Sequence, residues 1–315
     1  MWRWILALWV MLMAGCSPQS PHALKVATNS WLGYEPLYLA RYIGAYERSV
    51  DIVQLPSATD VMRALRNGNV DVAATTLDEA LLLASQGEDL VLLMALDFSV
   101  GADVVLGRPP IASLKDIKGK RVGVENTGMG ALMLSAALEM GGLSFADIRP
   151  VNLTIDQHLA AYAKGDIDVV VSFEPVATQL RNQGANLLFD SSAVPDLVVD
   201  VLVARRAALR NQDAAVVDLL RGYYQALLYL QTNTVEAHAF IARRMKLSGD
   251  ELQAAFARMR IPTRQDNLGW MTGSPSRFEQ TRDRLHQLMA ERGLLHPDGN
   301  DQLQADVRWL QQVTP

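Results

Sequence analysis

From Leu24 onward, short apolar runs alternate with amphipathic stretches along most of the chain. Such alternation is typical of strand–helix units, which build a mostly parallel sheet with helices on its faces. The first series of these units predicts strands at 24–28, 50–54, 71–75, 90–95 and 103–106, and helices at 36–46, 59–67 and 77–86. The chain is therefore expected to be an α/β protein.

A second series of similar units follows Pro109-Pro110. It predicts strands at 121–124, 148–151, 168–172, 186–189 and 197–204, and helices at 129–140, 157–164 and 175–183. After residue 211 the pattern predicts helices alone, at 213–231, 235–245, 249–258, 276–292 and near 303–310. We expect this helical appendage to pack on one lobe and leave the cleft open.

The two series share a weak internal match. Gly68-Asn69-Val70-Asp71 corresponds to Gly165-Asp166-Ile167-Asp168, with an offset of 97 residues from Asp71 to Asp168. In both copies a helix ends at a glycine, which adopts the left-handed conformation without a Cβ penalty, and an aspartate opens an apolar strand. The repeat predicts two related lobes with a cleft between them.

Composition excludes several functions. Cys16 is the only cysteine, so the domain after it has no disulfide, thiolate metal site or catalytic thiol. The net charge of −5 comes without a Lys/Arg stripe, which argues against a nucleic-acid partner. The histidines lack metal-ligand spacing, and neither a phosphate-binding loop nor a nucleophile elbow is present. We expect no metal, no cofactor and no catalytic residue.

The first residues predict export. Met1-Trp2-Arg3-Trp4 precedes the apolar run Ile5–Met13, which is too short to span a membrane and has the form of a signal peptide over residues 1–15. Met13-Ala14-Gly15-Cys16 resembles the bacterial lipoprotein box, so we expect lipidation of Cys16. Residues 16–23 then serve as a polar tether. The protein is expected in the periplasm or at the cell surface, anchored to the membrane through this lipid.

Several segments, taken in order, resemble the periplasmic binding proteins of the nitrate, taurine, aliphatic-sulfonate and thiamine-precursor group. They are Asn29-Ser30-Trp31-Leu32-Gly33-Tyr34-Glu35-Pro36, Gly68–Ala73, Leu114–Val124, Gly165–Asp168, Phe173-Glu174-Pro175, Phe189–Ser192 and Asp200–Arg205. The resemblance implies a two-lobed type II binding-protein fold with crossings near 106–108 and 199–201. Lobe one is then 24–107, lobe two 108–198, and 199–315 returns to lobe one.

The same resemblance implies the mode of action. Members of this group close over a small-molecule ligand and present it, as monomers, to the permease and ATPase of an ABC importer. Two alternatives stay open. One is a ligand-sensing lipoprotein that serves a membrane sensor, and the other is an enzyme of the pyrimidine-synthase or dehydratase kind on the same fold.

In open α/β sheets, ligands bind beyond the carboxyl ends of the strands. That rule selects a set of candidate ligand-binding residues: Asn29, Trp31, Tyr34, Glu35, Thr75, Thr76, Asp97, Phe98, Asn126, Thr127, Gly128, Phe173 and Glu174. Asn126-Thr127-Gly128 leads into a helix, whose free N–H groups suit an anionic or carbonyl oxygen. The aromatic members of the set suit an apolar or cationic group.

The carboxylates of Glu35, Asp97 and Glu174 bear on the ligand's charge. Carboxylates beside a cleft oppose a sulfonate or nitrate and favour an amine, amidine or heterocyclic N–H. No arginine falls in the selected loops. We therefore predict a nitrogen-bearing or zwitterionic small molecule, with a sulfonate-like ligand as the alternative.

Overall fold

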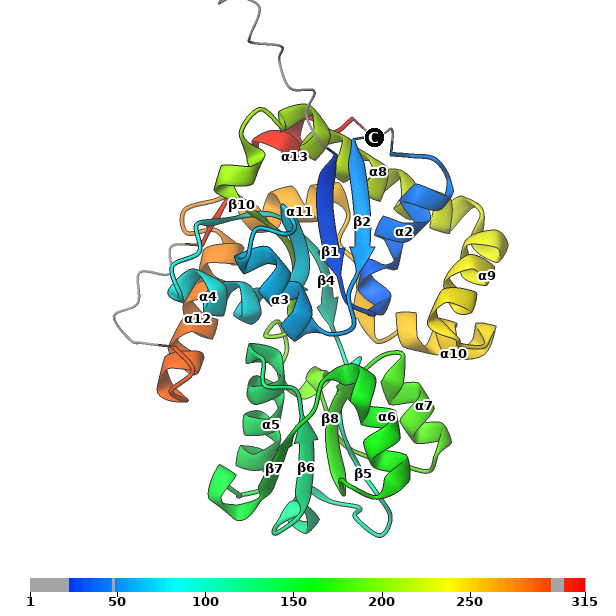
Figure 1. Cartoon of the computed structure of the whole chain (residues 1–315), viewed down its shortest axis with the longest axis vertical. Helices are drawn as coiled ribbons and strands as arrows, with labels where there is room; N and C mark the ends of the chain where they lie inside the picture. Colours follow the sequence, from blue (N-terminus) through cyan, green and yellow to red (C-terminus); the bar gives the residue numbers. More distant parts are fainter. Residues whose placement is uncertain (1–22, 47–48, 296–302, 315) are drawn as a thin grey trace, which may run out of the picture.

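The computed structural model describes residues 23–46, 49–295 and 303–314. Within these ranges the chain forms two β-sheets, each flanked by helices, one above the other in Figure 1. This arrangement confirms the predicted two-lobed α/β organisation. The expected signal peptide, the lipidated Cys16 and nearly all of the tether lie outside the described residues. None of the helices in the described part has the length and apolarity that crossing a bilayer requires.

The first lobe contains a seven-stranded sheet in the order β11-β4-β10-β3-β1-β2, with β12 paired to β4. The strands are β1 (Leu24–Thr28), β2 (Val50–Gln54), β3 (Val72–Thr76), β4 (Leu90–Ser99), β10 (Val199–Arg205), β11 (Met259–Arg260) and β12 (Gln304–Ala305). β1 pairs in parallel with β2 and β3, whereas β10 is antiparallel to β3 and β4.

The second lobe contains a five-stranded sheet in the order β7-β6-β8-β5-β9. Its strands are β5 (Asp103–Gly107), β6 (Arg121–Val124), β7 (Arg149–Asn152), β8 (Val169–Phe173) and β9 (Asn186–Asp190). β6 is parallel to β7 and β8, and β5 is antiparallel to β8 and β9. Both sheets are therefore mixed, which corrects the mostly parallel sheets expected. The cause is that β5 and β10, the strands that enter a lobe from the other lobe, run against their neighbours.

The crossings between the lobes lie beside these two strands. The chain leaves the first sheet after Ser99 and enters the second at Asp103, and it returns between Asp190 and Val199. The expectation that lobe one extends to residue 107 is wrong for 103–107, because β5 is the central partner of β8 and β9. The apolar sequence of β5 suits either sheet equally well, so hydrophobic periodicity alone assigned the strand to the wrong lobe.

Helices cover both sheets. Those of the first two series are α2 (Glu35–Tyr42), α3 (Ala58–Arg66), α4 (Leu77–Ser85), α5 (Gly128–Met140), α6 (Ile155–Lys164) and α7 (Val176–Asn182). The C-terminal ones are α8 (Asp213–Thr232), α9 (Thr234–Met245), α10 (Gly249–Phe256), α11 (Arg264–Met271), α12 (Arg277–Glu291) and α13 (Arg308–Gln312). Figure 1 shows α8–α13 around the first lobe. The helix expected near 303–310 starts later, because Gln304–Ala305 pairs with β4.

The internal match corresponds to a repeated local structure. Gly68 and Gly165 both follow a helix with left-handed φ angles of 73° and 76°. Asp71 accepts a hydrogen bond from the Lys25 backbone N–H at 3.0 Å, and Asp168 accepts one from the Arg121 N–H at 2.9 Å. In each lobe an aspartate at the start of one strand thus caps the start of its parallel neighbour, which fixes the edge of the sheet far from the cleft.

Candidate functional site

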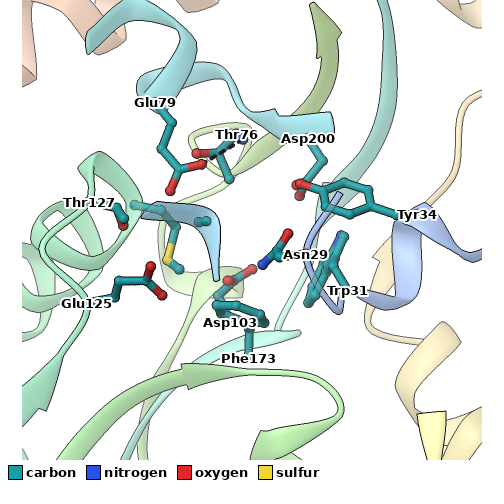
Figure 2. Close-up of a pocket in the computed structure, with 12 residues that line it drawn as sticks. Asn29, Trp31, Tyr34, Thr76, Glu79, Asp103, Glu125, Thr127, Phe173 and Asp200 are labelled. Carbon is teal, nitrogen blue, oxygen red and sulfur yellow. Dashed lines mark hydrogen bonds between the residues drawn. The ribbon is translucent and has the colours of Figure 1, made fainter. Parts of the chain in front are cut away.

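A narrow pocket lies between the two lobes, and its side chains leave only about 20 Å³ of free space inside it. Its lining comes from both sheets, as Figure 2 shows: Asn29, Trp31, Tyr34, Ala58, Thr76, Glu79, Asp103, Glu125, Thr127, Met129, Phe173 and Asp200. That space holds about one water molecule and is far below the roughly 300–1,000 Å³ typical of small-molecule sites. A ligand that touches both lobes at once therefore requires the lobes to move apart before it enters.

Aromatic side chains form one wall of the pocket. Trp31 follows β1, and Phe173 ends β8 in the other lobe. Their rings meet edge to face with centroids 5.6 Å apart. The Trp31 indole N–H donates to Asp97 Oδ2 at 2.9 Å, and the Tyr34 hydroxyl donates to Asp200 Oδ1. Because their polar atoms are directed at carboxylates, these rings are held in place.

A row of polar side chains crosses three strands of the first sheet at the pocket. Asp200 on β10 lies directly opposite Thr76 on β3 and opposite Asp97 on β4. Glu79, on the first turn of α4, adds a further carboxylate. Its Oε2 accepts hydrogen bonds from Thr75 Oγ1 at 2.5 Å and from the Thr76 N–H at 3.2 Å. The first lobe thus presents acceptors, held by sheet register and by a helix cap.

The second lobe contributes Asp103 and Glu125. Asp103 opens β5 opposite Phe173, and its Oδ2 is buried without a hydrogen-bond partner. Glu125 follows β6 and reaches across the cleft. Its Oε1 accepts from the Thr59 N–H at 2.9 Å and from Thr59 Oγ1 at 2.7 Å, while Oε2 accepts from the Ile155 N–H at 3.2 Å. Glu125 therefore joins the two lobes at the edge of the pocket.

The start of α5 does not offer the free oxyanion site that the sequence suggested. The Thr127 hydroxyl already accepts from the Gly130 N–H at 3.3 Å. The buried carboxyl of Asp78, from the first lobe, lies so close to Gly128 that a Cβ there would come within 2.3 Å of Asp78 Oδ2. An anionic ligand at this helix start would meet the Asp78 and Glu125 carboxyls.

Burial shifts the titration of these acids. Removal from water raises the pKa of Asp97 to about 7 and that of Asp103 to about 7, with neighbouring carboxylates adding to the rise. Burial likewise raises the pKa values of Asp78, Glu79 and Asp200. The physical cause is that a charged carboxylate in a low-dielectric cluster of like charges is disfavoured. A cation in the pocket would relieve that penalty.

Some predicted site residues line the pocket. They are Asn29, Trp31, Tyr34, Thr76, Thr127 and Phe173. Thr75 lies behind the lining and donates to Glu79, and Asp97 lies behind Trp31. Asn126 and Gly128 line a separate hollow beside α3 and α12.

The remaining predicted residues serve other contacts. Glu35 is buried against Arg244, with 2.7 Å between Nε and Oε2. Glu174 accepts from the Thr178 N–H at 3.0 Å and lies 3.6 Å from Arg181 Nη1. Phe98 points to the other face of its strand, where its ring lies 5.6 Å from that of Trp270. The structure does not bring these three side chains into the pocket lining.

Sequence reasoning missed half of the lining, namely Ala58, Glu79, Asp103, Glu125, Met129 and Asp200. A signal was present for two of them: Asp103 and Asp200 are single acids inside apolar runs. An ionisable residue in such a run is rarely buried without a role. In the described part of the chain, no three His, Cys, Asp or Glu side chains are grouped so as to hold a metal ion.

Comparison with known proteins places the chain in a family. A candidate aliphatic sulfonates-binding protein of Escherichia coli (strain K12) is 25% identical over 262 residues, covering 81% of each chain. The taurine-binding periplasmic protein of the same strain is 26% identical over 191 residues, 58% of this chain and 59% of its own.

The fold also matches a solved structure. The alkanesulfonate-binding protein SsuA from Xanthomonas axonopodis pv. citri bound to MOPS superposes with a TM-score of 0.72 at 19% identity, over 88% of this chain and 95% of SsuA. This likeness confirms the expected two-lobed binding-protein fold. The model of the NMT1/THI5-like family matches residues 33–237, more than half of the sequence. The protein therefore belongs to the NMT1/THI5-like family.

Proposed function

We propose that this protein is the solute-binding component of an ABC importer, which captures a nitrogen-bearing small molecule between its lobes and delivers it to a permease and ATPase. Family membership and relatives named as binding proteins support solute capture. The pocket lining, which comes from both lobes, supports capture between them, since contacts to both lobes supply the energy of closure.

The charge of the residues that line the pocket indicates the chemical class of the ligand. Four of the twelve lining residues are carboxylic acids, and none of the twelve is an arginine, lysine or histidine. A sulfonate or nitrate would lie among like charges with no cationic partner, at a cost that grows with burial. Relatives named for sulfonates therefore do not define the ligand here, and a ligand with N–H groups is the better match.

A thermal-shift screen of the full chain tests this proposal. The panel contains amines, amino acids, amidines, pyrimidines, sulfonates and nitrate. A ligand present at about 100 times its Kd adds roughly 2.7 kcal/mol, which raises Tm by a few degrees. We expect shifts among nitrogen-bearing compounds. Shifts confined to sulfonates or nitrate would preserve solute capture and contradict a nitrogen-bearing ligand, and the absence of any shift would contradict capture itself.

Transport is tested separately. Deleting the gene is expected to abolish cellular uptake of the ligand that the screen identifies. Unchanged uptake alongside a lost transcriptional response would favour the sensor alternative.

We also propose that the protein acts in the periplasm or at the cell surface, anchored through a lipid on Cys16. The sequence Met13-Ala14-Gly15-Cys16 supports this. Cys16→Ser is expected to move the protein from the membrane fraction to the soluble fraction, with Ser17→Ala as the matched control. A Cys16→Ser protein that stays with the membrane would contradict the anchor.

A further inference from the structure

The acids of the pocket are distributed over both lobes. Glu79 and Asp200 belong to the first lobe, and Asp103 and Glu125 to the second. Figure 2 shows them around the pocket, with Glu79 and Asp200 above and Glu125 and Asp103 below. A ligand that answers this arrangement must carry positive charge or hydrogen-bond donors toward two opposite sides. Such a ligand would occupy the same site as the proposed solute, and its identification rests on the proposed function.

The carboxyl of Asp103 lacks a hydrogen-bond donor for one of its oxygens. Asp103 is 3% exposed and lines the pocket, and its Oδ2 has no hydrogen-bond partner, although the nearby Ser99 hydroxyl lowers the pKa of the carboxyl against the larger rise that burial causes. Leaving a buried acceptor unpaired costs roughly 1–3 kcal/mol, and more for a charged group. Native proteins rarely leave such an atom without a partner. A ligand donor directed at Asp103 would remove this cost.

A metal ion does not match the site. Metal ions need several ligands that converge on one point, whereas no three acidic or histidine side chains of the described residues form such a group. The pocket also has Trp31, Tyr34, Phe173 and Met129 in its lining. Rings and a thioether suit a flat organic group, and an aromatic face attracts an organic cation.

A quaternary ammonium also fails, although aromatic rings often bind one. Such a group has no N–H, so Asp103 Oδ2 would be covered by methyl groups and remain unpaired. We infer that the ligand is a flat organic cation whose charge is carried by N–H groups directed at both lobes, as in an amidinium, a guanidinium or a protonated amino-heterocycle.

Isothermal titration calorimetry on the full chain, with four probes of nearly equal size, tests the inference. Benzamidine is flat, cationic and rich in N–H donors. Benzamide is its neutral isostere, phenyltrimethylammonium is cationic without N–H, and benzenesulfonate is an anion. We expect benzamidine to bind at least about tenfold more tightly than benzamide and phenyltrimethylammonium. Benzenesulfonate should not bind.

Variants tie the binding to the pocket. Asp103→Asn and Glu79→Gln, which keep side-chain shape, are each expected to weaken benzamidine binding by about tenfold or more. Glu35→Gln removes an equally buried carboxylate that pairs with Arg244 outside the pocket lining, and it should leave the affinity unchanged. Thermal melts of each variant show whether it is folded. If Asp103→Asn fails to fold, the benzamidine affinity of Glu79→Gln tests the inference.

The outcomes distinguish failure of the inferred ligand class from failure of the proposed solute capture. Equal binding of benzamidine and benzamide, tighter binding of phenyltrimethylammonium, or no benzamidine binding would each overturn the flat N–H cation. Benzenesulfonate binding would overturn it too while leaving solute capture intact. A protein that binds none of the four probes and nothing in the wider panel would contradict both the cation and the proposed function.

Discussion

Asp97 and Asp200 face each other directly across the antiparallel strands β4 and β10, and both side chains are almost completely buried. Like charges at directly opposite positions repel, so the two acids are not both ionised without a counter-charge. Trp31 donates to one and Tyr34 to the other, which stabilises each side chain in position. The pair supplies a region of the first lobe that gains stability when either a proton or a cation is present.

Asp200→Asn is expected to stabilise the unliganded protein at pH 8 by about 1 kcal/mol or more, because it removes one buried charge of this pair. At pH 5, where the wild-type pair holds a proton, the difference should shrink. Urea unfolding at both pH values measures it. Asp168→Asn is the control with opposite sign, since Asp168 is paired with Arg121 and its loss should destabilise. Equal stability of Asp200→Asn and wild type at pH 8 would contradict the pairing argument.

The free energy of unfolding is expected to fall as pH rises from about 4 to about 7. The pKa values of Asp97 and Asp103 are raised from 3.8 to about 7, so in this window the native state holds protons that the unfolded chain has lost. Each such group lowers the free energy of unfolding by on the order of 1 kcal/mol per pH unit. His158, whose pKa burial lowers to about 4, offsets one group below pH 6.5. Urea unfolding from pH 5 to 8 checks this, and a steady rise would refute it.

Benzamidine affinity is expected to increase over the same pH range. The cation prefers an ionised carboxylate, so binding releases the proton that Asp103 in the pocket lining holds below about pH 7. The gain approaches about tenfold per pH unit for each proton released. Calorimetry in buffers of different ionisation heat counts those protons. A pH-independent Kd with no proton release would contradict the linkage.

Thr59→Ala is expected to weaken ligand binding by about tenfold, because the Thr59 hydroxyl donates across the cleft to the buried Glu125 carboxylate. The unliganded Tm should change little, since the bond joins the lobes and lies outside either core. Ser57→Ala is the matched control on the same helix. It removes the cap to the Asp60 N–H, so it should cost about 1 kcal/mol of stability and leave the affinity unchanged. A Thr59→Ala protein that loses stability but keeps its affinity, beside a Ser57→Ala protein that loses affinity, would disprove the role of Thr59.

Gly33→Ala is expected to destabilise the protein by about 1–3 kcal/mol and to reduce ligand affinity. An added Cβ would lie 1.7 Å from Asp97 Oδ2 and 2.6 Å from Trp31 Nε1, so it would push apart the bond that holds the aromatic wall. Gly269→Ala meets nothing within 4 Å in helix α11, so it should be neutral or slightly stabilising. Chemical denaturation of both variants checks the pair. Equal free energies of unfolding for the two variants would rule out the close contact at Gly33.

The sequence predicted the order of the elements well, because hydrophobic periodicity reports which faces are buried. It predicted the pocket less completely for a geometric reason. The rule used was that ligands lie beyond the carboxyl ends of strands, and it found Thr76 and Phe173 at the ends of β3 and β8. β10 and β5 run antiparallel to these strands, so their first residues lie at the same edge. Asp200 and Asp103 were missed for that reason.

Side-chain direction explains the remaining differences. Asp97 and Phe98 both lie near the end of β4, but successive side chains point to opposite faces, so Asp97 supports Trp31 while Phe98 packs against Trp270. Glu35 was predicted to bind the ligand, but in the fold it forms an ion pair with the distant Arg244. The sequence has no local signal for a partner more than two hundred residues away, and such partners decide whether an acid is free to bind.

The two crossings between the lobes are joined to each other. The hydroxyls of Ser99 and Ser191 are 2.7 Å apart, and Ser191 Oγ also accepts from the Gly101 N–H at 2.7 Å. We expect two connections tied side by side to move as one hinge, so that a single angle describes how far the cleft is open. A transporter that meets this protein could then distinguish loaded from empty by the spacing of two rigid surfaces, without any contact with the solute.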